Sequence, residues 1–511
     1  MKKLLLLLSV VIAGCGGGGS GNNTATPNAV SPQAMALSQT ESDQYFIEKQ
    51  NAFPDLTVIY NSLCGNSTQI QFITPVDLNG DRKTDILAVA FCDLNGQKLK
   101  NYPYGSEYHG PMPTSLITLL QKNDGTFELG NRQLFGKDIV DVAGFGKPAI
   151  GDFNNDGKPD IVIGSRLEDG RAFVTMLDGS SSWDSPVAVI MSTSTNKYTI
   201  EFLPKGMNNS VPVFKDTDGR DVFQASNSVW RYDNGTWIRK QPFNNLTGDA
   251  RFFSSNNSNY SITSIWGELG IGVSLLKQVG SDWITQHNFT MGDIKKVNVY
   301  APDFGSNGYS TQYLLTINNT DWLMPSVSDM CLANINGKQY IFAVLDGYKM
   351  RDRYNGNLIT LPSNTAPSYQ TVSMDDYSQQ LYVALVENEK IISVSAPTFG
   401  TQLNNFLSEG NGLNCPDMNN DHIMDVVFNR WGANPTPYVF LNNNNTLVKV
   451  DDLVIPKVTS DYTNGGTSTM LDLNNDGKID LLYYPSQGYN VNSNVSGTGR
   501  FQLFLGSKSL N

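Results

Sequence analysis

The sequence has few of the residues on which common active sites depend. Its 511 residues include only three His and five Cys, and the Cys spacings match no zinc-binding pattern. It contains no nucleophile elbow, no H-E-x-x-H motif, no phosphate-binding loop and no dinucleotide fingerprint. These absences argue against the enzyme classes that those motifs define, and we assign no catalytic residue from the sequence.

Basic residues and long apolar runs are also scarce. The 36 Lys and Arg are outnumbered by 48 Asp and Glu, which gives a net charge of −12. A surface of this sign repels phosphate backbones and anionic lipid headgroups, so we expect no nucleic acid partner. It is suited to divalent cations. After the N-terminus, no apolar run approaches the roughly 20 residues of a membrane-spanning helix.

The N-terminus is typical of an export signal. Lys2 and Lys3 precede an apolar run, Leu4 to Ala13, that is too short to span a bilayer as a helix. The run ends in Ile12-Ala13-Gly14-Cys15, which resembles the bacterial lipobox, in which the Cys becomes the lipidated first residue of the mature protein. We therefore expect a lipoprotein signal peptide at residues 1–14 and a lipid on Cys15. An ordinary signal peptide with an incidental Cys is the alternative.

A tether and one large folded domain are expected after the signal. Residues 15–42 begin with Gly, Ser, Asn and Thr, a composition that cannot bury a core and behaves as a flexible linker. Gly16 stands where an Asp would retain the protein at the inner membrane, so resemblance to Gram-negative sorting rules implies the outer membrane. The sequence leaves open which face of the cell envelope the domain, residues 43–511, occupies.

One nine-residue acidic pattern occurs four times in this domain. All four copies have Asp at positions 1, 5 and 9 and Asn at position 3, and a strand-like apolar run follows each. The copies are DLNGDRKTD at 77–85, DFNNDGKPD at 152–160, DMNNDHIMD at 417–425 and DLNNDGKID at 472–480. Strands separated by polar turns that end in an aromatic or apolar residue recur between them, which is the usual hairpin signal.

Repeated units of strand, acidic loop, strand and hairpin predict an all-β fold, a β-propeller of four-stranded blades. The spacing of the loops indicates seven blades and the number of hairpins indicates eight, and we slightly favour eight. The chain ends on a strand without a returning partner, so an N-terminal strand such as Leu56 to Tyr60 is expected to complete the last blade. A short helix from Gln33 to Asn51 is a weaker prediction.

The acidic loops have the ligand chemistry of calcium sites. Ca²⁺ takes six to eight oxygen ligands, which side chains at positions 1, 3, 5 and 9 and the main-chain carbonyl at position 7 can supply. Mg²⁺ prefers fewer protein ligands, and an EF-hand needs a Glu at position 12, where Ile163 and Tyr483 stand in two of the loops. Plain hydrated turns are the alternative. The predicted ligands are Asp77, Asn79, Asp81, Lys83, Asp85, Asp152, Asn154, Asp156, Lys158, Asp160, Asp417, Asn419, Asp421, Ile423, Asp425, Asp472, Asn474, Asp476, Lys478 and Asp480.

The motif D-x-N-x-D-G-x-x-D before an apolar strand resembles the FG-GAP/VCBS repeat of integrin α-subunit propellers and many exported bacterial proteins. This resemblance implies that each loop joins the first two strands of a blade and holds calcium. Arg82 and His422 depart from it at position 6, where the family has Gly. The loop at Asp216 is one residue short, and the segments near Asp303 and Asp375 are weaker still, so we assign none of these three full coordination.

The remaining Cys and His residues support limited predictions. Cys64 and Cys92 flank the first acidic loop, and we prefer them as a disulfide pair in an exported chain; buried reduced thiols are the alternative. The pairing of Cys331 and Cys415 is left open. His109 lies in a Gly- and Pro-rich segment, residues 95–114, which is the best candidate for a loop that faces a ligand.

Three kinds of function remain compatible with the sequence. The favoured one is a calcium-stabilised binding or adhesion module of the cell envelope, with a glycan or a protein as its partner. The second is an extracellular calcium-dependent polysaccharide lyase on the same scaffold, with a Tyr, Lys or His as the base. The third is a scaffold subunit of a larger envelope assembly.

Overall fold

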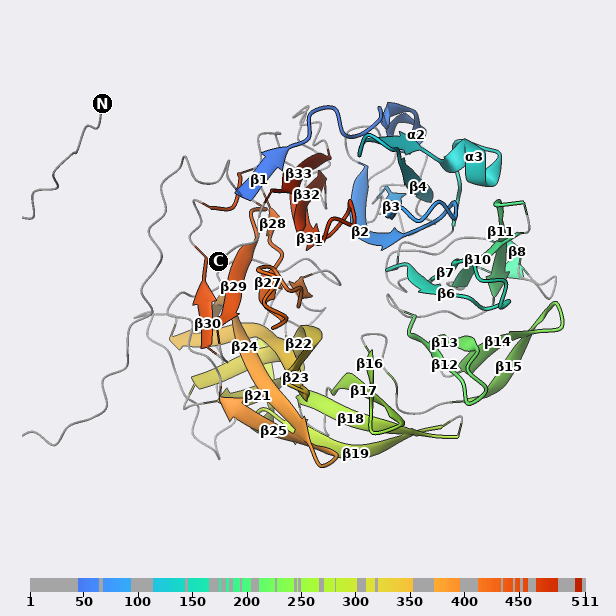
Figure 1. Cartoon of the computed structure of the whole chain (residues 1–511). Coiled ribbons are helices and arrows are strands. Elements are labelled where there is room, and N and C mark those ends of the chain that lie inside the picture. Colours follow the sequence, from blue (N-terminus) through green and yellow to red (C-terminus); the bar gives the residue numbers. More distant parts are fainter. Residues whose placement is uncertain are drawn as a thin grey trace, which may run out of the picture.

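The chain folds into seven antiparallel sheets arranged as blades around a ring, a seven-bladed β-propeller (Figure 1). This architecture is seen in a computed structural model. It describes residues 45–63, 68–92, 114–142, 146–164, 174–175, 181–182, 187–193, 195–203, 211–225, 228–242, 246, 250–265, 271–280, 282–300, 309–317, 320–352, 372–395, 412–432, 435–443, 446–450, 454–457, 466–485 and 501–507.

The first four blades are regular four-stranded meanders, with the first strand of each nearest the ring axis (Figure 1). Blade 1 consists of β2 (Gln69–Val76), β3 (Asp85–Phe91), β4 (Thr114–Gln121) and β5 (Phe127–Leu129). Blade 2 consists of β6 (Ala149–Gly151), β7 (Asp160–Ile163), β10 (Val187–Ser192) and β11 (Tyr198–Leu203). Blade 3 consists of β12 (Val213–Lys215), β13 (Asp221–Ala225), β14 (Ser228–Asp233) and β15 (Thr236–Pro242). Blade 4 consists of β16 (Arg251–Ser255), β17 (Ser258–Ile265), β18 (Gly272–Val279) and β19 (Asp282–Thr290).

The last three blades carry additions. Blade 5 consists of β22 (Thr320–Ile335), β23 (Lys338–Asp352), β24 (Val372–Glu387) and β25 (Lys390–Ser395), and its sheet is extended by β20 (Asp293–Tyr300) and β21 (Tyr309–Ile317). Blade 6 consists of β26 (Leu413–Asn414), β27 (Val426–Phe428), β29 (Tyr438–Asn443) and β30 (Thr446–Lys449). Blade 7 consists of β31 (Gly466–Leu471), β32 (Asp480–Pro485), β33 (Gln502–Gly506) and β1 (Phe46–Glu48), with β28 (Trp431–Gly432) added beside β31.

The ring is closed by the N-terminal strand of the described chain. β1 pairs antiparallel with β33, with Phe46 opposite Gly506 and Glu48 opposite Phe504 (Figure 1). The closure by an N-terminal strand is therefore confirmed, but the segment is not the predicted one. Most of the stretch from Leu56 to Tyr60 belongs to a short helix, α2 (Thr57–Ser62). The predicted helix from Gln33 to Asn51 is wrong over β1, and its residues 33–44 lie outside the described part of the chain.

The preference for eight blades was wrong because two hairpin signals belong to one blade. The turn between β21 and β22 and the turn between β24 and β25 lie in the same six-stranded sheet. Another strand-turn-aromatic pattern in the sequence, which ends in the letters SSSW at 180–183, includes a separate two-stranded sheet, β8 (Val174–Thr175) and β9 (Ser181–Ser182), within the sequence of blade 2. The spacing of the acidic loops, which indicated seven, was the better guide.

The core consists of side chains packed between neighbouring blades. All seven residues of β3 are buried, and successive side chains of a strand point to opposite faces of its sheet. Ile86 and Ala88 pack with residues of β32 in blade 7, whereas Leu87 and Val89 pack with residues of β7 in blade 2. A strand covered on both faces has no polar alternation, which explains the continuous apolar run after each acidic loop.

The described residues also contain two short helices and a disulfide between neighbouring blades. Besides α2, a helix α3 (Asn131–Phe135) follows blade 1. A disulfide joins Cys331 in β22 to Cys415 just after β26, and so links blades 5 and 6. Among the described residues, no helix has both the length and the apolar character that a membrane crossing requires.

Candidate functional site

The four acidic loops fold in the same way and occupy equivalent places. They join the first and second strands of blades 1, 2, 6 and 7, at one end of the ring that we call the acidic-loop face. In blade 1, the Asp77 carboxylate accepts backbone N–H bonds from Asp81 (3.1 Å) and Arg82 (2.8 Å), and Asp81 accepts one from Lys83 (3.0 Å). The other three loops repeat these bonds at positions 1 and 5.

Position 6 of each loop has a left-handed backbone. Gly157 and Gly477 both have a φ of 80°, a conformation that glycine adopts without steric cost. Arg82 (φ 68°) and His422 (φ 66°) adopt it as well, despite their Cβ atoms. The two departures from the family pattern therefore keep the loop shape at a cost in backbone strain.

The Asp at position 9 ties each loop to the third strand of its own blade. Asp85, Asp160, Asp425 and Asp480 are all fully buried, with 0% exposure. In blade 7, one oxygen of Asp480 accepts the N–H of Leu473 at loop position 2 (2.9 Å), and the other accepts the N–H of Gly506 in β33 (2.8 Å). The other three loops use the same two bonds, to position 2 and to Gln121, Ser192 or Asn442. Position 9 therefore has a structural role that the sequence alone did not suggest.

Burial raises the pKa of these position-9 carboxyls. The pKa of each of Asp85, Asp425 and Asp480 rises to about 6, and desolvation is the largest cause of this rise. The two accepted backbone N–H bonds act in the opposite direction, and the negative charges at positions 1 and 5 raise the pKa further. Three carboxylates of one loop thus lie close enough to repel one another.

The donor set of the loops fits calcium better than other metals. Within the described ranges, no cluster of three or more His, Cys, Asp or Glu side chains is arranged as a ready metal site. The loops nevertheless offer only oxygen donors, which Ca²⁺ prefers, and a bound cation would offset the mutual repulsion of the carboxylates. Positions 1, 3, 5 and 9 and the carbonyl of position 7 would hold the ion.

Blade 3 neutralises its degenerate acidic loop with its own basic side chains. Asp216, between β12 and β13, is 5% exposed, and its carboxylate pairs with Arg231 (3.0 Å) and Lys240 (2.6 Å). Arg231 also binds Asp218 at 2.6 Å. Burial tends to raise the pKa of Asp216, but the bond from Lys240 and the other polar contacts lower it below its ordinary value. This loop therefore has two protein cations on the carboxylate at its first position, whereas the lysines of the blade 1 and blade 7 loops, Lys83 and Lys478, contact the carboxylate at position 5.

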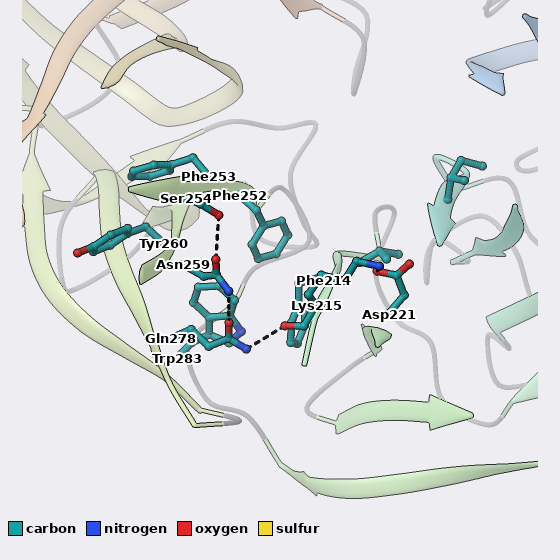
Figure 2. A pocket seen from close by; sticks show the side chains of 12 residues that line it. Phe214, Lys215, Asp221, Phe252, Phe253, Ser254, Asn259, Tyr260, Gln278 and Trp283 are labelled. Carbon is teal, nitrogen blue, oxygen red and sulfur yellow. Dashed lines mark hydrogen bonds and ion pairs between the residues drawn. The ribbon is translucent and has the colours of Figure 1, made fainter. Parts of the chain in front are cut away.

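A pocket of about 310 Å³ opens between blades 3 and 4 on the acidic-loop face (Figure 2). The ends of β12 and β16 and the start of β17 form much of its wall. Three of its aromatic rings form a cluster. The centroid of Trp283 lies 5.5 Å from that of Phe214 and 5.4 Å from that of Phe252. On the opposite side, Phe253 stacks on Tyr260 at 5.3 Å.

A chain of polar groups crosses the same pocket (Figure 2). Ser254 donates to the Asn259 side-chain carbonyl (2.8 Å), and the Asn259 amide donates to the Gln278 carbonyl (2.8 Å). The Gln278 amide then donates to the main-chain carbonyl of Lys215 (2.9 Å). At the rim, the Lys215 ammonium lies 2.9 Å from Asp221.

Asp221 connects this pocket to the acidic loop of blade 2. Its second carboxylate oxygen accepts the backbone N–H of Asp152, which is position 1 of that loop (2.8 Å). The pocket was missed in the sequence because its residues come from seven strands of three blades.

Several other predicted residues lie outside the described part of the chain or are not ligand positions of the four acidic loops. Residues 95–113, His109 among them, and Cys64 lie outside the described residues; Cys92 is disulfide-bonded. His422 is a 96% exposed side chain beside Asp417. Asp303 is not described, and Asp375 lies within strand β24 rather than in a loop, so the weak acidic segment at that position does not form a loop of this type.

The class of protein follows from the fold and the repeated loops: a β-propeller with acidic motifs between the first two strands of its blades. Residues 147–175 match the FG-GAP repeat, and residues 417–483 match the FG-GAP-like repeat. The chain is therefore an FG-GAP repeat β-propeller. No curated protein sequence matches it at a significant level.

Solved structures with a related arrangement are distant. An exotype rhamnogalacturonan lyase, YesX, is 12% identical with a TM-score of 0.38, over 86% of this chain and 72% of that one. An exo-β-1,3-galactanase from Clostridium thermocellum is 11% identical with a TM-score of 0.28, over 90% and 96%. A 6-phosphogluconolactonase homologue from Bacteroides uniformis is 11% identical with a TM-score of 0.30, over 78% and 99%. Likeness at this level carries no argument about activity.

Proposed function

We propose that this chain is a calcium-stabilised binding module of the cell envelope, attached at the outer membrane through a lipid on Cys15, with a glycan or protein partner. The observation that supports calcium is the repeated loop, in which a buried position-9 carboxyl lies near two further carboxylates. A cation that binds only the folded state stabilises it by mass action.

The pocket between blades 3 and 4 supports the binding part of the proposal. It combines aromatic rings with amide groups that are held in place by hydrogen bonds, and mixed pockets of this kind are typical of ligand sites. The test is a glycan array probed with the purified protein in calcium and again in chelator. We expect retention of at least one glycan class in calcium. Failure to retain any glycan, together with no retained envelope protein in a matched pull-down, would contradict the binding function.

A calcium-dependent polysaccharide lyase is the second candidate, and one basic residue favours it. Burial first, and the charge of Arg251 second, lower the pKa of Lys147 to about 8, while Asp329 acts in the opposite direction. Lys147 precedes β6, Arg251 begins β16 and Asp329 lies in β22, all of them strands near the ring axis. A lysine with this pKa is a competent general base near neutral pH. Turnover of uronic-acid polymers that is lost in Lys147→Met would favour the lyase over the binding module.

A further inference from the structure

We propose that the pocket between blades 3 and 4 is a subsite for one neutral sugar ring of a glycan. This inference rests on the proposed binding function and names the chemistry of its ligand. A sugar ring has an apolar face of C–H groups and an edge of hydroxyl groups, and the pocket offers a matching surface to each.

The aromatic side of the pocket is fixed in position. Phe252 is half-buried at the pocket wall, and its ring is held between Phe214 (centroids 5.6 Å apart) and Trp283 (5.4 Å). A ring that is already immobilised loses little conformational entropy when a ligand packs against it. The cluster therefore provides an apolar surface for the C–H face of a sugar.

The polar side retains hydrogen-bonding capacity. A side-chain amide has two N–H donors and a carbonyl oxygen with two lone pairs. Asn259 uses one donor toward Gln278 and accepts one bond from Ser254, and Gln278 uses one donor toward the carbonyl of Lys215. Each amide thus keeps one N–H for a ligand, in an orientation that the chain of bonds sets in advance.

The size and charge of the pocket define the ligand further. A volume of about 310 Å³ is at the lower end of the roughly 300–1,000 Å³ of small-molecule sites, so it suits a single ring better than a protein loop. The Lys215 ammonium at the rim is already paired with Asp221 at 2.9 Å. A uronate would have to compete with this carboxylate, so a neutral hexose or N-acetylhexosamine is preferred.

The test is saturation-transfer NMR of the purified protein with four probes: methyl β-galactoside, methyl β-glucoside, methyl N-acetyl-β-glucosaminide and methyl β-glucuronide. We expect transfer to at least one neutral probe and at least about threefold weaker binding of the glucuronide. Asn259→Ala should weaken binding about tenfold, the equivalent of one lost hydrogen bond. Gln286→Ala, in β19 of the same blade, is the matched control and should bind as the wild type does.

A second pair of variants guards against loss of the fold. Phe252→Tyr keeps the aromatic ring and should retain binding, whereas Phe252→Leu should lose about tenfold in binding while its circular dichroism spectrum still shows a folded protein. The inference is overturned if no neutral probe receives transfer, or if Asn259→Ala and Phe252→Leu bind like the wild type. A glycan that is retained on the array but is insensitive to both variants would overturn this subsite and leave the proposed binding function standing.

Discussion

The charge balance of blade 3 yields a quantitative prediction. Asp216 is buried, with Arg231 at 3.0 Å and Lys240 at 2.6 Å from its carboxylate. Replacing both cations in the Arg231→Met/Lys240→Met variant keeps an unbranched apolar side chain at each position but leaves the carboxylate buried without an ionic partner. Breaking a buried pair in this way costs about 3–5 kcal/mol of the free energy of unfolding. Because one cation remains, Arg231→Met alone should cost less, about 1–3 kcal/mol.

The assay is urea denaturation followed by tryptophan fluorescence, in calcium and in chelator. Asp218→Asn is the control, because the Asp218 side chain, which pairs with Arg231, is 40% exposed. Exposed ion pairs contribute less than about 1 kcal/mol to the free energy of unfolding. Adding Asp216→Asn to the double variant should restore most of the lost stability, since it removes the unpaired charge. A double variant that loses less than about 1 kcal/mol would refute the reasoning, and so would a failure of Asp216→Asn to restore stability.

Three further predictions concern the loops and the disulfide. Because the pKa of Asp425 is about 6, protons should compete with calcium and lower the affinity of this loop about tenfold from pH 7 to pH 5, measurable by titration calorimetry. In chelator, the raised pKa of Asp425 stabilises the folded protein at low pH. This contribution to the free energy of unfolding is fully present below about pH 4 and is lost as the pH rises through 6. His422→Gly should gain up to about 1 kcal/mol in urea denaturation, because His422 has a φ of 66°. Replacing Cys331 and Cys415 by Ser should cost about 2–5 kcal/mol, since their disulfide closes a separation of 84 residues; equal stability would contradict this.

The repeated parts of the fold could be predicted from the sequence because the same residues recur at fixed positions. Asp77 and Asp472 lie at the same place in their blades, and the apolar runs after them form the second strands. The blade count was harder, because the hairpins of β21 and β24 look alike in sequence but belong to one sheet. The closing strand β1 was missed because three residues, Phe46 to Glu48, carry too little periodicity to be recognised.

The candidate sites also differ in how far the sequence alone could predict them. The ligand positions of each acidic loop are local in sequence, so their pattern identifies them without a structure. The role of Asp480 at position 9 depends on Gly506, and the role of Asp216 depends on Lys240, which only the folded chain brings near. The pocket depends on packing between blades 3 and 4, so no local pattern could have indicated the proximity of Phe252 and Trp283.

The most direct test of the calcium-stabilised propeller is the metal content of the purified chain, measured together with its melting curve. We expect four calcium ions per chain, one for each acidic motif, and a lower melting temperature in chelator. Asp156→Ala should remove one ion from blade 2, and Asp218→Ala in blade 3 should remove none. A protein that holds no calcium and melts at the same temperature in chelator would contradict this assignment.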